Sequence, residues 1–214
     1  QKGDDFLRAM LLRMKIMMAA YFGDFETAAD LALITFDLHH EAIPASVAFL
    51  PLSFFCSFAC YVAVSMNRRS RRVIRQYKRM ATRARRMIQM WNNRGNPNCA
   101  HYLAILDAER SIGKPPTPPG RFAGRSNKQH PAVASYQKAI RLTARRGFIN
   151  DRAFANERLA YYFRQHTDDE ESARFHFDEA MRLYKEWGAD GKVKSMEGKS
   201  NHLWQPPSEI EVTM

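Results

Sequence analysis

The sequence predicts an all-α protein made of helical hairpins stacked side by side, and three observations lead to this fold class. Apolar residues recur at spacings of three and four through most of the 214 residues. Glycine and proline cluster in a few places between these apolar stretches, as turns between helices require. A small–large–small pattern occurs twice, as Ala132, Tyr136, Ala139 and again as Ala173, Phe177, Ala180.

The repeated pattern predicts two helices that pack closely on their neighbours. Spacings of four and three put the members of each copy on one helical face. The small residues let a neighbouring helix approach closely, and the aromatic ring fills the gap beside it. This arrangement resembles the second helix of a tetratricopeptide hairpin, so we expect a TPR-like α-solenoid over residues 132–197.

The N-terminal part, residues 1–112, is expected to form further hairpins. Residues 4–22 are apolar and rich in methionine, and they end at Gly23, which favours a helix with a glycine stop. Asp24 is suited to cap a second helix that runs to about residue 41. We expect that helix to turn Ala28, Ala32 and Phe36 inward.

Residues 43–66 are uncharged and apolar or small almost throughout, and two interpretations fit them. A central helix buried on every side would have this composition. A membrane-spanning helix followed by a basic flank would also have it. Pro44, Pro51 and the four serines argue against the membrane-spanning helix, and membrane anchoring through 43–66 stays an alternative.

Residues 68–94 predict a strongly basic amphipathic helix. The segment contains no acid, and its arginines and lysine account for the net charge of +11. Its apolar seam steps by three and four through Val73, Tyr77, Met80, Ala84, Met87 and Trp91. The candidate interaction face consists of Arg71, Arg75, Lys78, Arg79, Arg83 and Arg86.

The remaining segments are assigned from their start and stop signals. Asn96-Pro97 opens a helix that ends near Arg110, and the Pro- and Gly-rich residues 113–131 form a loop. A first repeat helix covers 150–165, and Thr167 with Glu170 predicts a capping box for the next one. Tyr184 and Trp187 are expected to pack in the interior, and residues 198–214 are expected to be a disordered tail.

Several strings in the C-terminal part resemble the helical-repeat region of large multidomain signalling ATPases. They are Arg146-Gly147-Phe148, Ala155-Asn156-Glu157-Arg158-Leu159-Ala160 and Tyr184-Lys185-Glu186-Trp187-Gly188. In such proteins a kinase-like domain and an AAA/STAND-type ATPase precede the repeats, and a GAF domain with a histidine kinase or cyclase often follows. The resemblance, together with a first residue that is Gln1, implies a segment of a longer signal-transduction protein. It assigns no catalytic residue.

The chain offers no constellation that demands catalysis, a metal or a cofactor. Gly198-Lys199-Ser200 lacks the earlier glycine of a phosphate loop, because Val193 stands at that position. Cys56, Cys60 and Cys99 do not have the spacing of a metal site. His39-His40, Asp107 and Glu109 could be assembled into an acid–base set, but nothing in their spacing requires it. We therefore expect no enzyme activity from this chain and no cofactor.

The expected function is a non-catalytic scaffold for protein–protein or interdomain contacts. An acidic domain is the expected partner of the basic face, and a small-molecule ligand is not expected. Nucleic-acid binding through 68–94 is the alternative, since clustered cations neutralise phosphates. The low cysteine content favours the cytoplasm. Arg68-Arg69-Ser70-Arg71-Arg72 could direct the chain to the nucleus.

Overall fold

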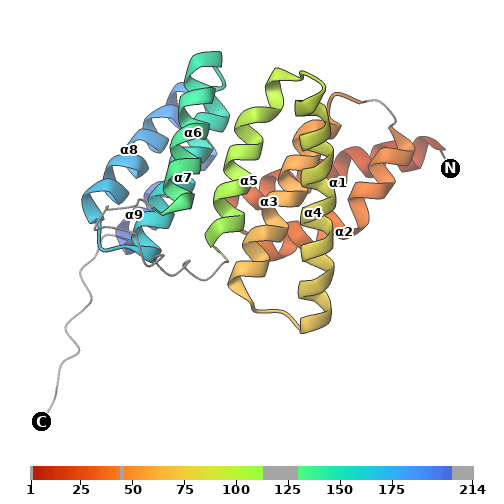
Figure 1. Cartoon of the computed structure of the whole chain (residues 1–214), viewed down its shortest axis with the longest axis horizontal. Coiled ribbons are helices and arrows are strands. Elements are labelled where there is room, and N and C mark those ends of the chain that lie inside the picture. Colours follow the sequence, from red (N-terminus) through yellow and green to blue (C-terminus); the bar gives the residue numbers. More distant parts are fainter. Residues whose placement is uncertain (1, 44–45, 113–129, 204–214) are drawn as a thin grey trace, which may run out of the picture.

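The computed structural model describes residues 2–43, 46–112 and 130–203, and every regular element in these ranges is a helix (Figure 1). Consecutive helices pack as antiparallel pairs, so the predicted all-α stack of hairpins is confirmed. The pairs are α1 (Lys2–Phe22) with α2 (Phe25–Ala42), α3 (Phe49–Met66) with α4 (Arg71–Asn93), α5 (Ala100–Ile112) with α6 (Pro131–Arg146), and α7 (Ile149–His166) with α8 (Glu170–Glu186). A short 3-10 turn, Pro97–Cys99, precedes α5, and a last helix, α9 (Asp190–Leu203), packs on α8 and α1.

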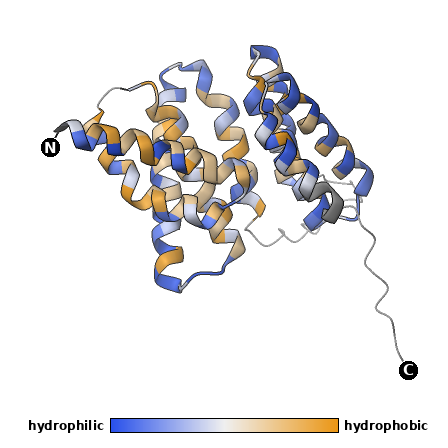
Figure 2. Ribbon diagram, turned by 180° about the vertical axis from the view of Figure 1, so that it is seen from behind, coloured by the Kyte–Doolittle hydropathy of each residue, from blue (hydrophilic) through white to orange (hydrophobic). Residues whose placement is uncertain are grey.

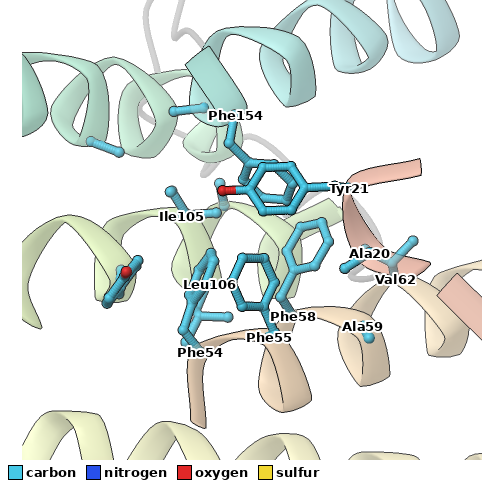
Figure 3. Close-up of a cluster of buried hydrophobic side chains, with 14 of the residues drawn as sticks. Ala20, Tyr21, Phe54, Phe55, Phe58, Ala59, Val62, Ile105, Leu106 and Phe154 are labelled. Atoms are coloured by element: carbon cyan, nitrogen blue, oxygen red, sulfur yellow. The ribbon is translucent and has the colours of Figure 1, made fainter. Parts of the chain in front are cut away.

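Helix α3 lies at the centre of the core. Residues 52–60 of this helix are all buried, although it is long and apolar enough to cross a membrane. Burial on every side explains the lack of polar positions that left the sequence ambiguous. Figure 3 shows that the rings of Phe54, Phe55 and Phe58 gather around Tyr21 of α1 and Phe154 of α7.

The first helices of the four hairpins therefore share one core. Phe154 lies with its ring centre 4.9 Å from that of Phe58 and 5.3 Å from that of Tyr21. Tyr21 also contacts Tyr184, with ring centres 6.5 Å apart. In an open solenoid each repeat touches only its neighbours. Here the end of the first helix reaches the last hairpin, which makes the stack more closed than a linear array.

The six repeat-packing residues are all buried in the positions that the pattern predicts. Ala132, Tyr136 and Ala139 lie on α6, and Ala173, Phe177 and Ala180 lie on α8. The inward positions Ala28, Ala32 and Phe36 of α2 are buried as well. Spacings of three and four alone were enough to identify these faces.

Two buried carboxylates tie consecutive hairpins together. Glu109 of α5 accepts a hydrogen bond from the Tyr136 hydroxyl of α6 at 2.5 Å and pairs with Arg158 of α7 at 2.7 Å. Glu157 of α7 repeats this arrangement with Tyr184 of α8 at 2.8 Å and Lys192 of α9 at 2.6 Å.

Each set of carboxylate, tyrosine hydroxyl and cation joins one hairpin to the helix that follows it. Lys192 also donates to the backbone carbonyl of Tyr21, which attaches α9 to α1. The hydroxyl and the cation satisfy a carboxylate that would otherwise be costly to bury.

Two local predictions are corrected by the structure. Thr167 does not cap α8; its N–H donates to the Phe163 carbonyl and ends α7. Asp169 is the N-cap of α8, because its carboxylate reaches the Ser172 N–H at 2.9 Å. Trp187 is 46 % exposed rather than interior, whereas Tyr184 is fully buried as predicted.

The predicted boundaries of the loop and the tail also change. Most of the loop, 113–129, lies outside the described residues, and Pro131 already belongs to α6. The tail expected from residue 198 is wrong for 198–203, because α9 continues to Leu203. Lys192, Val193 and Met196 are buried and hold this helix on the body of the protein. Residues 204–214 lie outside the described part.

Replacing Ala180 by leucine should destabilise the protein by about 1–3 kcal/mol, because the added atoms have no space in a tight helix contact. Ala173→Leu should behave in the same way, and Phe177→Leu should cost less than either. Urea denaturation would measure the effect. Ala144→Leu on the exposed side of α6 is the matched control and should change stability by less than about 0.5 kcal/mol. Equal stability of the Ala180 and Ala144 variants would show that Ala180 does not lie in a tight contact with a neighbouring helix.

Replacing Lys192 by methionine should cost about 3–5 kcal/mol, because Glu157 would stay buried without its cation. Thermal or urea unfolding checks this, and Lys194→Met on the exposed side of α9 serves as the control. Adding Glu157→Gln to Lys192→Met should recover part of the loss, since the neutral amide costs less to bury. A double variant that is less stable than Lys192→Met would argue against a buried charge as the cause.

Candidate cationic interaction face

Helix α4 forms where the sequence places a cap and an apolar seam. The Ser70 hydroxyl accepts a hydrogen bond from the Val73 N–H and starts the helix. The buried face is wider than the predicted seam, because Ile74, Ala81 and Ile88 join it, while Val73, Met87 and Trp91 are only partly buried. The remaining circumference of α4 holds the arginines.

On the flank that faces α2, the cations of α4 and of the turn before it are paired with acids. Arg83 binds Asp37 through both terminal nitrogens at 2.9 and 2.5 Å, and its guanidinium lies 5.1 Å from the ring centre of Phe36. Arg69 contacts Asp30 at 2.9 Å and Glu26 at 3.4 Å. Arg83 was predicted to belong to the interaction face, but it fixes α4 to α2.

On the opposite flank, α4 is paired with α5. Arg85 donates from two nitrogens to one carboxylate oxygen of Asp107, at 2.7 and 3.2 Å. Arg110 of α5 lies 3.7 Å from the same oxygen. Asp107 therefore forms an ion pair between α4 and α5.

Between these flanks lies a line of cations directed to solvent, which we call the outer stripe. It consists of Arg71, Arg72, Arg75, Lys78, Arg79 and Arg86, all exposed. At 100° per residue these positions fall on the side of α4 opposite the buried Tyr77 and Ala84. No acid of the described ranges forms an ion pair with any of them. Five of the six predicted face residues belong to the stripe, and Arg72 is an addition.

The aromatic residues of α4 do not lie on the outer stripe. Tyr77 is fully buried and donates its hydroxyl proton to Asp30. Trp91 packs edge-on against Phe49, with ring centres 5.9 Å apart. The outer stripe therefore presents charge but no aromatic ring of α4 to solvent, as the positions of Tyr77 and Trp91 on the apolar seam predict.

The other candidate residues are separated in the fold. His39 of α2 is buried beside Phe49 of α3, with ring centres 5.7 Å apart. Glu109 is instead bound to Tyr136 and Arg158. Gly198, Lys199 and Ser200 lie within α9, so they form no loop around a phosphate.

The cysteines are buried and inert in their surroundings. Burial raises the pKa of the Cys56, Cys60 and Cys99 thiols, which keeps them protonated. Among the described residues, no group of three or more histidine, cysteine or acidic side chains could hold a metal ion.

No family model, curated protein or solved structure matches the chain. The structure identifies stacked antiparallel helices without identifying a family. The resemblance to signalling ATPases thus stays a prediction from the residue pattern.

The Arg83–Asp37 pair should stabilise the protein modestly and only above acidic pH. The hydrogen bond from Arg83 lowers the pKa of the Asp37 carboxyl below its ordinary value of 3.8. A lowered pKa stabilises the folded state above 3.8 and loses this effect as pH falls through the folded value. Since both side chains are about half exposed, Asp37→Asn should cost only about 0.2–1 kcal/mol at pH 7.

Urea unfolding at pH 7 and at about pH 2 would measure this difference, because carboxylates are mostly protonated at the lower pH. Asp178→Asn, at an exposed position of α8, is the control and should have no such effect. A cost of Asp37→Asn that stays the same at both pH values would show that the ion pair is not the cause.

Proposed function

We propose that this chain is a non-catalytic protein scaffold whose outer stripe binds an acidic partner. The observation that supports the proposal is the division of the α4 cations. Acids of α2 and α5 pair with cations on both flanks, while the outward cations face no acid of the described chain. An external acidic surface would complete this charge pattern.

The dimensions of the stripe suit a helix or an extended acidic segment. From Arg71 to Arg86 the helix rises by about 22 Å at 1.5 Å per residue. A line of cations of that length gives steering and register to an acidic partner. Such binding should weaken with salt, because the interacting charges are exposed.

An exposed apolar surface on α1 also favours a protein partner. Leu7, Leu11, Met14 and Met18 are between 46 % and 67 % exposed and follow one another at helical spacings. Figure 2 shows apolar colour along the helices next to the N-terminus and along the central helices, whereas the C-terminal helices are mostly hydrophilic. Contiguous exposed apolar residues of this kind mark sites of contact with other proteins or with membranes.

The broader context that we propose is the repeat segment of a cytoplasmic, multidomain signal-transduction ATPase or kinase. The residue strings over 139–188 support it, and the stacked hairpins suit a segment that links two modules. Packed helices can transmit a change at one end to the other through their shared core. On this proposal the chemistry belongs to other domains of the parent protein.

Reversing the charge of the outer stripe tests the proposed function. The triple variant Arg71→Glu, Arg75→Glu, Arg79→Glu removes no buried side chain, so the helical content and melting temperature should be close to those of the wild type. At about 0.15 M salt, its affinity for a deca-glutamate peptide should fall by at least about tenfold, because attraction is replaced by repulsion. Fluorescence anisotropy would measure both affinities.

The control reverses three exposed cations of α6, Lys138, Arg141 and Arg145, and should bind the peptide as the wild type does. Equal losses in the two variants would show a general charge effect and contradict a specific face. A single-stranded RNA of about twenty nucleotides is the second probe. Sub-micromolar RNA binding at this salt concentration, lost in the stripe variant, would favour the nucleic-acid alternative over the protein scaffold.

A further inference from the structure

A cavity of about 470 Å³ opens between α3, α4 and α5. Tyr61 and Val64 of α3 form its apolar lining, and Thr82 lies on the α4 side. Four cations complete the lining: Lys78, Arg85 and Arg86 from α4 and Arg110 from α5. Arg71, Arg75 and Arg79 of the outer stripe do not line the cavity.

The cavity has an excess of positive charge. Asp107 is the acid that binds Arg85 and lies near Arg110, and it offsets one of these two charges. Glu109 also lines the cavity, but its charge is matched by Arg158 and its oxygen accepts the Tyr136 hydroxyl. Three positive charges in the cavity are thus left without a matching acid.

The cavity also provides a donor and an apolar wall. Burial raises the pKa of Tyr61, which is partly buried beside Arg85 and Arg110, so its hydroxyl keeps its proton and can donate a hydrogen bond. Guanidinium groups present paired donors that match the oxygens of a phosphate. The ring of Tyr61 and the methyl groups of Val64 would contact an apolar body.

We propose that this cavity binds a phosphate monoester that has an apolar or aromatic body. Close to two negative charges on such a group near pH 7 suit the unmatched cations better than the single charge of a carboxylate. Its body would cover the Tyr61 and Val64 surface, which inorganic phosphate would leave exposed. The site shares Lys78 and Arg86 with the outer stripe and extends beyond it to Arg85, Arg110 and the apolar wall.

Calorimetric titration of the full chain with phenyl phosphate tests the proposal. The variant Lys78→Gln/Arg86→Gln should weaken binding by about tenfold or more, since it removes two charged donors. Its matched control, Arg75→Gln/Arg79→Gln, removes the same charge from the same helix outside the cavity and should change binding by less than about twofold. Equal losses in both variants, or no binding of phenyl phosphate by the wild type at millimolar concentration, would overturn the proposal.

Three further probes define the ligand. Phenyl phosphate should bind more tightly than benzoate, which has one charge, and more tightly than inorganic phosphate, which has no apolar body. Benzoate that binds as tightly as phenyl phosphate would overturn the assignment of a phosphate site. A short peptide with a central phosphotyrosine distinguishes the sources: tighter binding than phenyl phosphate indicates a phosphorylated partner, and equal binding indicates a free small molecule.

The stripe variant Arg71→Glu, Arg75→Glu, Arg79→Glu separates this proposal from the scaffold function. It should lose the deca-glutamate peptide and keep phenyl phosphate, because none of its three positions lines the cavity. Loss of phenyl phosphate together with the peptide would show that both probes respond to the general charge of α4, and would overturn the separate site.

Discussion

The buried carboxylates of Glu109 and Glu157 are the constraint on which the stack of helices depends. Each carboxylate accepts a hydrogen bond from a tyrosine hydroxyl on the second helix of its own hairpin. Each also forms an ion pair with a cation on the helix that follows. A buried charge is tolerated only with such partners, so α7 and α9 must lie where Arg158 and Lys192 can reach. The hydrophobic core alone would fix these positions less strictly, because apolar contacts have no direction.

The position of the cationic face follows from the same core. Helix α3 is buried on nearly all sides, so α4 covers it and turns the opposite side to solvent. The wide buried face of α4 fixes the rotation of this helix about its axis. The salt bridges to α2 and α5 then neutralise the flanking arginines, and the outer stripe remains between the two flanks. The cations of α4 that have no acidic partner thereby lie on one side of the helix instead of around its whole circumference.

On the two proposals above, the cavity and the outer stripe recognise different kinds of partner. The outer stripe is a line of exposed charges and suits a long acidic surface. The cavity brings fewer cations together beside an apolar wall of Tyr61 and Val64, which suits a compact dianion with an apolar body.

The sequence by itself determined the helical hairpins, the buried repeat residues and the basic helix, because each follows from spacings of three and four within one segment. The sequence did not determine which residue caps α8. Thr167 and Asp169 can both cap a helix, and only the geometry of the chain selects Asp169. Tertiary structure decided which arginines are paired within the chain, since Arg83 meets Asp37 across 46 residues. It also decided the extent of α9 and the cavity between three helices. These features depend on side chains that are far apart in sequence. The spacing of apolar residues within one segment does not predict which distant residues will be in contact.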